Sequence, residues 1–282
     1  MQIRYPLLAA LIAVAIWGVN VVAIKVGIAE ISPTLFNALR FGLLSVLLIP
    51  FARIPKSQLK PVIWIALVMG IGHFYLLSVG MQYADSNTSV ILVMLGAPIS
   101  SILSFALGME RISRQQALGV IIAFSGIALP LLLNGSAELK VGALFILISM
   151  TCWAMTNILV RRLEHVPLLA LQFWIGVISA PICFVGYQLS GSELSVVEQL
   201  NVRVVLSIAF TVLGSSILAY SLWYATVNQH GINKVVSITF LQPLFTMIFA
   251  YIVLNEVISG WQLTGGAITL AGIYLYYFSR RT

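Results

Sequence analysis

Two ionisable side chains lie in the middle of long apolar runs, where a lipid bilayer would make them costly. His73 follows a Gly-Ile-Gly string, and Arg40 lies about two turns into its run. Ionisable groups at such depth are candidates for function. His73 could exchange a proton near neutral pH, whereas Arg40 stays charged. The alternatives are a neutral His73 bonded to a neighbouring helix, and an Arg40 that pairs structurally or forms a cavity wall.

Uncharged polar and aromatic side chains form stripes on several of these runs. Trp17 and Asn20, for example, are three residues apart and share one helical face. Small polar residues in membrane helices often only permit close packing. Because the stripes recur on several runs, we expect them to line one central cavity. The predicted cavity residues are Trp17, Asn20, Arg40, His73, Trp153, Asn157, Tyr220 and Gln242.

Two prolines, Pro98 and Pro243, occupy matching places in the fourth and ninth apolar runs. Each removes one amide donor and clashes with the carbonyl four residues earlier, on Met94 or Thr239. The freed carbonyls need other partners inside a bilayer. The sequence therefore predicts two kinks and favours a hinge at each of them.

The sequence argues against catalysis, metal binding and a resident cofactor. The nearest match to a protease Gly-x-Ser-Gly string is Ala123-Phe124-Ser125-Gly126, which fails at its first residue. An acidic metal-binding cluster and a phosphate-binding Gly-x-x-x-x-Gly-Lys-Ser/Thr loop are both absent. Acidic residues fall at the ends of the runs. Proton coupling through His73 and flow down a substrate gradient are therefore equally compatible with the sequence.

Composition places the chain in a membrane. Hydrophobic residues make up 60% of the 282 residues and charged residues 8%, against about 25% charged residues in soluble domains. The basic residues that give the net charge of +7 are scattered singly along the sequence, so we expect no nucleic-acid partner. The runs long enough to span a bilayer lie near 7–28, 34–52, 61–82, 87–108, 115–133, 141–160, 167–189, 203–225, 234–254 and 260–279.

The second half of the chain repeats the first. Residues 110–127 match residues 256–273 at 8 of 18 positions, at a fixed offset of 146. Each copy holds five runs, and copies with an odd number of spans insert in opposite orientations. We predict an all-α integral membrane protein with ten transmembrane helices, built as two inverted five-helix repeats at 1–136 and 137–282.

The distribution of Lys and Arg predicts that both termini are cytoplasmic. With that orientation, 11 of the 15 basic residues lie inside and three lie outside, at Lys25, Lys140 and Arg203. The inside residues are Arg4, Arg53, Lys56, Lys60, Arg111, Arg114, Arg161, Arg162, Lys234, Arg280 and Arg281.

Runs five and ten carry small residues on one face, Gly119-x-x-x-Ala123-x-x-Gly126 and Gly265-x-x-x-Thr269-x-x-Gly272. Such faces let two helices approach closely. We expect peripheral packing helices, which contact either their own bundle or a second protomer in a homodimer.

The chain resembles the drug/metabolite transporter superfamily, EamA-type, over nearly its whole length. The strings that carry the resemblance are Ile16-Trp17-Gly18-Val19-Asn20-Val21-Val22-Ala23-Ile24-Lys25-Val26-Gly27, Leu39-Arg40-Phe41, Gly108-Met109-Glu110-Arg111-Ile112-Ser113 and Leu254-Asn255-Glu256-Val257-Ile258-Ser259. Glu110 and Glu256 match its recurring acidic position, for which we expect helix capping or pairing with a nearby Arg. Gln172 stands roughly where Arg40 would map in the second repeat, so a substrate contact through Arg40 would belong to the first repeat alone.

The resemblance implies a central substrate cavity between the repeats. It also implies a secondary transporter in the bacterial inner membrane that exports small amino acids or related metabolites by alternating access. The first-span string is most similar to exporters of cysteine and O-acetylserine. The alternative is a channel-like or scaffold membrane subunit without active transport.

Overall fold

The structure is a computed structural model that describes residues 5–109, 112–134, 136–160, 162–190, 199–230 and 236–278. Several residues used above lie outside these ranges, namely Arg4, Glu110, Arg111, Arg161, Lys234, Arg280 and Arg281. Their predicted roles are therefore still predictions.

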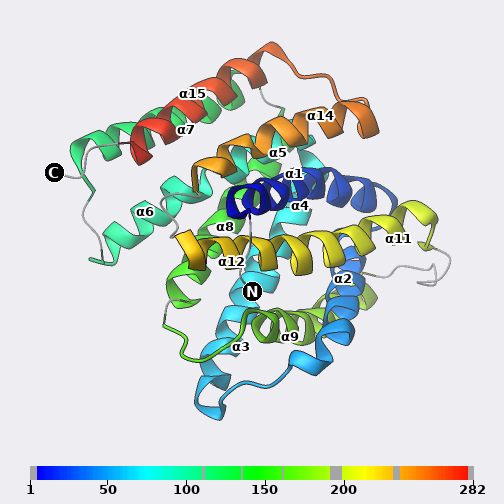
Figure 1. Cartoon of the computed structure of the whole chain (residues 1–282). Helices are drawn as coiled ribbons and strands as arrows, with labels where there is room; N and C mark the ends of the chain where they lie inside the picture. The colour runs from blue at the N-terminus through cyan, green and yellow to red at the C-terminus, as the bar shows by residue number, and fades with distance from the viewer. Residues whose placement is uncertain are drawn as a thin grey trace.

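All of the regular structure in the described ranges is helical (Figure 1). The first half contains α1 (Pro6–Glu30), α2 (Pro33–Leu48), η1 (Ile49–Phe51), η2 (Lys56–Gln58), α3 (Leu59–Leu67), η3 (Val68–Tyr75), α4 (Leu76–Tyr83), α5 (Ser86–Met94), α6 (Gly96–Ala106) and α7 (Arg114–Asn134). The second half contains α8 (Ala137–Val160), α9 (Leu168–Leu189), α11 (Val202–Ala209), η4 (Phe210–Ala219), α12 (Tyr220–His230), η5 (Val236–Leu241), α14 (Gln242–Leu254) and α15 (Gly260–Tyr277).

These segments join into ten helical rods, and the prediction of an all-α membrane protein is confirmed. In chain order the rods are α1, α2 with η1, η2 to α4, α5 with α6, α7, α8, α9, α11 to α12, η5 with α14, and α15. Within the described residues, seven of the rods are long and apolar enough to cross a bilayer, and Ile238–Leu254 is a shorter apolar helix. The surface is apolar and polar groups lie inside. Ile121 is 65% exposed, for example, while Arg40 is 1% exposed. Lipid is the solvent that such a surface requires.

Side chains at the starts of the helices explain where several rods begin. Ser259 accepts from the amide of Gln262, and the Gln262 side chain accepts from the amide of Ser259, which closes a capping box at α15. Ser113 and Gln116 make the same pair of bonds at α7. The repeated Ser-x-x-Gln string is therefore a helix-start signal used twice.

The α-helical hydrogen bonding is interrupted at matching places in the two halves. η3 and η4 are π-helical stretches inside the third and eighth rods, and such stretches often mark functional positions. The fourth rod breaks at Leu95, just before Pro98. In the ninth rod, the 3₁₀ segment η5 ends where α14 begins, next to Pro243.

The small-residue faces of α7 and α15 meet each other within one chain, at one edge of the bundle (Figure 1). A Cβ added to Gly119 would lie 2.7 Å from the Gly272 carbonyl, and one added to Gly126 would lie 2.7 Å from the Gly265 carbonyl. The start of each helix therefore faces the end of the other, so α7 and α15 run antiparallel. A homodimer through these two helices is still a prediction, and it would have to use their outer faces.

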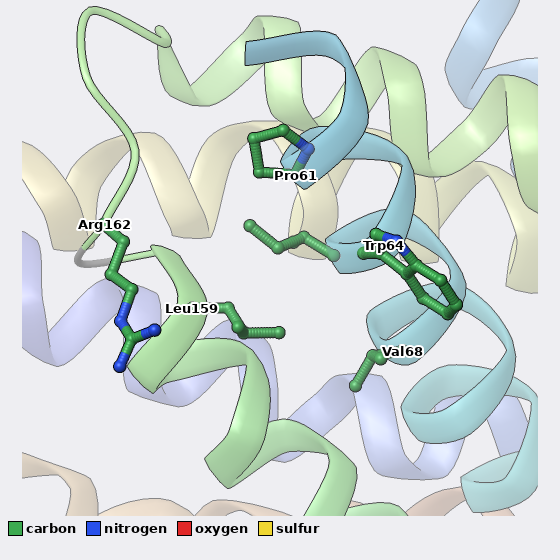
Figure 2. A pocket seen from close by; sticks show the side chains of 6 residues that line it. Pro61, Trp64, Val68, Leu159 and Arg162 are labelled. Carbon is green, nitrogen blue, oxygen red and sulfur yellow. The ribbon is translucent and has the colours of Figure 1, made fainter.

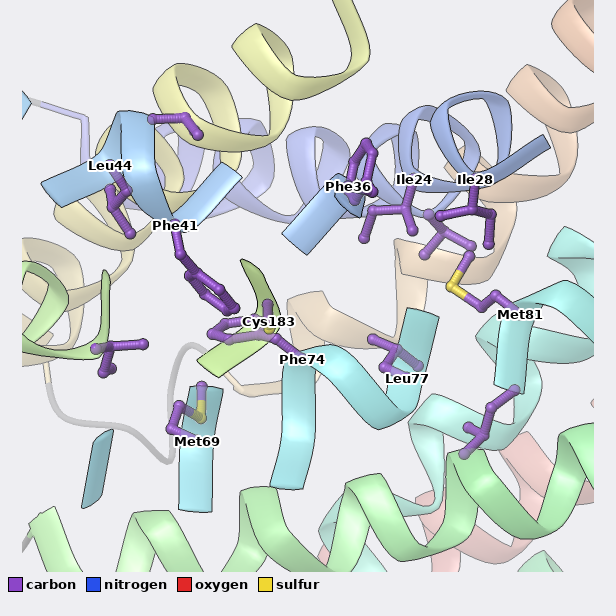
Figure 3. Packing of buried hydrophobic residues seen from close by; sticks show 14 of the residues in the cluster. Ile24, Ile28, Phe36, Phe41, Leu44, Met69, Phe74, Leu77, Met81 and Cys183 are labelled. Atoms are coloured by element: carbon purple, nitrogen blue, oxygen red, sulfur yellow. The ribbon is translucent and has the colours of Figure 1, made fainter. Parts of the chain in front are cut away.

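A hydrophobic core joins the rods of the first half to α9. Figure 3 shows Phe41, Phe74 and Cys183 close together, with Ile28 and Met81 on the far side of Leu77. Phe41 and Phe74 have their ring centroids 6.1 Å apart. This packing fixes α2 against η3 and α9, which places Arg40 among buried side chains.

Substituting Gly272 by alanine should destabilise the fold. Its Cβ would lie against Ala123 and within 2.6 Å of the Gly119 carbonyl, and these are backbone atoms that cannot rotate away. We expect a loss of about 1–3 kcal/mol and a lower melting temperature in detergent. Gly42→Ala is the matched control, because nothing lies within 4 Å of that Cβ. Equal melting temperatures for the two variants would contradict the close contact.

Candidate functional site

Arg40 is a fully buried charged side chain that contacts both halves of the chain. Its Nη2 is 3.4 Å from the Ser216 hydroxyl in η4, and its Cζ lies 4.2 Å from the centre of the Phe74 ring. The centre of the Phe41 ring lies 5.4 Å from the same Cζ atom. The guanidinium is therefore held by aromatic rings, a favourable arrangement for a cation.

His73 joins the two repeats. Its Nδ1 lies 2.9 Å from the Ser149 hydroxyl and 3.3 Å from the Ser149 carbonyl, both on α8. The imidazole is buried and its centre is 4.7 Å from the Phe74 ring. This is the neighbouring-helix bond that the sequence left open as an alternative to proton exchange.

Trp17 belongs to an aromatic cluster between the first and eighth rods. Its ring lies 5.1 Å from Tyr220 and 5.3 Å from Trp223. The three side chains are partly exposed although they lie along long apolar rods. Within the described structure, Trp17 Nε1 and Asn20 Oδ1 are buried without hydrogen-bond partners. One unused donor and one unused acceptor thus lie three residues apart on α1, where a small polar solute could bind.

Trp153 and Gln242 lie beside the two proline positions. On α1, a Cβ at Gly18 would lie 2.9 Å from the Gln242 carbonyl, next to Pro243. A Cβ at Gly96 would lie 3.2 Å from Trp153 of α8, close to Pro98. The first helix of each repeat therefore packs on the interrupted rod of the other repeat. Asn157 is half-buried further along α8.

A polar cluster at the α4–α5 turn joins the two repeats at one end of the bundle. Glu256 accepts hydrogen bonds from the amide of Ser86 at 2.9 Å and from its hydroxyl at 3.1 Å, so it caps α5. Asp85 accepts from the Thr88 amide and from the Gln262 side chain. Through these hydrogen bonds, the cluster holds the start of α5 against the connection between α14 and α15.

Lys25 completes the cluster from α1. Its Nζ donates to the carbonyls of Met81 and Ala84, where α4 ends. Cations are favourable at such a helix end. Lys25 therefore bonds to protein carbonyls at the end of a helix in its own repeat.

Burial, and then the nearby Asp85 carboxylate, raise the pKa of Glu256 above its ordinary value. The two bonds from Ser86 and the charge of Lys25 act in the opposite direction. The sequence predicted capping for Glu256, but it did not show that the capped helix belongs to the other repeat. The Asp-Ser-x-Thr string at 85–88 was an available signal, because it is a helix start.

An apolar groove of about 380 Å³ lies between α3 and the end of α8 (Figure 2). Its lining residues are Pro61, Trp64, Ile65, Val68, Leu159 and Arg162. Predicted cavity residues do not contribute to it, and Trp64 is 59% exposed. We assign no polar site to this groove. Within the described residues, no group of three His, Cys, Asp or Glu side chains could hold a metal ion.

Comparison with known proteins gives one consistent result. The EamA-like transporter family model matches residues 4–132 and again residues 140–278. A probable amino-acid metabolite efflux pump of Salmonella typhimurium is 27% identical, covering 96% of this chain and 94% of its own. The Escherichia coli protein of the same description is 24% identical, with 96% and 94% covered. The uncharacterized transporter YoaV of Bacillus subtilis is 27% identical, with 94% and 95% covered.

The fold has been seen before in a crystal structure. That structure covers 100% of this chain and 100% of its own, with a TM-score of 0.67 and 15% identity. At this identity the likeness concerns the fold alone.

The raised pKa of Glu256 predicts a pH-dependent stability. A raised pKa means that the folded protein holds the proton more tightly than the unfolded chain does. The stabilisation of the fold that comes from Glu256 is therefore complete below its ordinary pKa of 4.5. It is lost as the pH rises through the raised pKa. We expect the melting temperature of the wild type to fall relative to Glu256→Gln over that range. Glu164→Gln, which changes an exposed carboxylate, should follow the wild type. A constant difference between wild type and Glu256→Gln would contradict the expectation.

Proposed function

This chain belongs to the EamA-like transporter family, and we propose that it exports small amino acids or related metabolites by alternating access. It is a multi-pass membrane transporter, and its family is not a family of enzymes, as the sequence predicted. The export of amino-acid metabolites is suggested by the relatives from Salmonella and Escherichia coli, which are described as probable efflux pumps of that kind.

One observation supports the two-state mechanism more than any other. The equivalent helices α7 and α15 run antiparallel, because Gly119 faces Gly272 while Gly126 faces Gly265. Equivalent helices of opposite direction are what two inverted repeats, 1–136 and 137–282, would provide. Exchange of the conformations of two such halves would convert an inward-open transporter into an outward-open one.

In this proposal the predicted residues have three different roles in transport. Ten spans with both termini cytoplasmic place the Glu256 cluster at the outer face of the plasma membrane. The cluster is then an outer closure, and the breaks at Pro98 and Pro243 are the hinges. The substrate path runs along the polar and aromatic side chains of the first, second, third, sixth, eighth and ninth rods, at Trp17, Asn20, Arg40, His73, Trp153, Asn157, Tyr220 and Gln242.

The structure favours a positioning role for His73 over proton carriage. Its ring is buried and already bonded to Ser149 across the repeat interface. A carrier that needs no proton at His73 is the simpler proposal. His73→Ala should then lower flux without changing its dependence on pH, and a changed pH dependence would favour coupling through His73.

The wild-type protein in liposomes should show saturable counterflow. Vesicles loaded with an unlabelled amino acid should transiently accumulate the radiolabelled form above equilibrium, because a carrier exchanges one solute for another. A panel of amino acids and their O-acetyl derivatives is the appropriate test. Non-saturable leakage without counterflow would favour the channel-like alternative, and no flux at all with any solute would favour the scaffold.

Trp17→Phe should raise the KM for the transported solute about three- to tenfold while leaving kcat nearly unchanged. The substitution removes the indole N–H, which lacks a partner in the described protein, and one hydrogen bond contributes about 0.5–1.5 kcal/mol. Trp64→Phe is the matched control, because Trp64 lies in the exposed apolar groove. Equal KM values for Trp17→Phe and the wild type would remove Trp17 from the path.

A further inference from the structure

The guanidinium of Arg40 is a buried cation with unused donors. The side chain is 1% exposed, and its Nε and Nη1 have no hydrogen-bond partner within the described ranges. The single bond found there, from Nη2 to Ser216, is long at 3.4 Å. Buried polar groups in proteins are nearly always hydrogen-bonded. Arg40 therefore departs from what a purely structural arginine would show.

The described part of the fold supplies no counter-charge to Arg40. The one ion pair found in the described ranges joins Arg203 to Glu30 at the ends of helices. The other described carboxylates lie at helix ends or in connections, at Asp85, Glu138, Glu164 and Glu256. Because arginine stays protonated, the described residues hold a positive charge in a medium of low polarity and give it no carboxylate partner. This arrangement is costly unless a bound anion completes it.

Two aromatic rings lie close to the guanidinium of Arg40, and hydroxyl groups lie on the helices that pack against its own helix. Phe74 and Phe41 occupy positions near its planar faces, and Figure 3 shows these two rings beside Cys183. The elements η4 and α9, which both pack against α2, also carry Thr211 and Ser179, whose buried hydroxyls lack partners in the described structure. N–H and O–H donors around a cation are the chemistry that recognises a carboxylate.

Arg40 is also connected to the aromatic cluster of the proposed path. Tyr220 lies on the same rod as Ser216, the hydrogen-bond partner of Arg40, and its ring lies against Trp17. Tyr220 follows Ser216 by four residues on the same rod, so the two side chains lie near one helical face. A solute bound at Trp17 could thus reach Arg40 once the long bond to Ser216 is exchanged.

We propose that Arg40 binds the carboxylate of the transported solute, so that the transporter selects solutes carrying a free carboxylate. The inference rests on the proposed function and deepens it. Gln172, which stands roughly where Arg40 would map in the second repeat, is uncharged. A single carboxylate is therefore bound, and it is bound by the first repeat.

The test compares each amino acid with its own carboxamide, which keeps the side chain and the amine. Counterflow in liposomes would use L-cysteine and L-alanine beside L-cysteinamide and L-alaninamide. We expect the wild type to prefer the carboxylates at least tenfold in kcat/KM. Arg40→Met should lose this preference, and Arg40→Lys should keep part of it. Arg203→Met, at an exposed ion pair, should behave as the wild type.

Melting temperatures distinguish binding from a structural role. Removing an unpaired buried charge should leave the Tm of solute-free Arg40→Met equal to or above that of the wild type. The free amino acids should raise the Tm of the wild type but not that of Arg40→Met. A lower Tm for both Arg40 variants, with equal loss of flux for acids and amides, would assign Arg40 to the scaffold and overturn the proposal.

The proposed function and the proposed role of Arg40 can fail independently of each other. If the wild type shows no counterflow with any solute, export is wrong, while a carboxylate-dependent rise in Tm that requires Arg40 would still support the site. If the wild type transports carboxamides as well as acids, export stands and the role of Arg40 is wrong.

Discussion

The hydrocarbon of a bilayer offers no water to an amide or a carbonyl, and this constraint organises the whole chain. Continuous helices satisfy most backbone groups internally, and side chains satisfy the ends of several of them. At the α4–α5 turn, Lys25 binds the carbonyls that α4 leaves free, and Glu256 binds the first amide of α5. These two side chains come from α1 and from the other repeat. The hydrogen bonds that satisfy the end of α4 and the start of α5 therefore also connect the two halves of the molecule.

The same constraint makes each interruption of a rod informative. η3 and η4 depart from α-helical hydrogen bonding, and they carry His73 and Ser216. The contacts of these two residues lie on other rods, at Ser149 and Arg40. The π-helical stretches therefore occur where polar side chains form hydrogen bonds between one rod and another. The regular helices α7 and α15, by comparison, meet through small residues and carry little polarity.

Much of the fold could be predicted from the sequence, because apolar length and capping residues act locally. The helix starts at Ser113 and Ser259 are examples, as are the breaks near Pro98 and Pro243. The partners of the polar side chains could not be predicted. Nothing in the spacing of Arg40 and Ser216, 176 residues apart, indicates that they touch. Lys25 has a stem long enough for lipid headgroups or for protein carbonyls, and only the packing of α4 decides between them.

The contact between α7 and α15 also has a consequence for how the two copies associate. Ala123 and Thr269 are equivalent positions of the two copies, and the Thr269 hydroxyl donates to the Ala123 carbonyl at 3.1 Å. Around that point the glycines pair reciprocally, Gly119 with Gly272 and Gly126 with Gly265. Self-complementary contact of this kind is the signature of a twofold homodimer. The two copies that the family model matches therefore meet here as two identical subunits would, and the covalent link between them keeps each at a high effective concentration for the other.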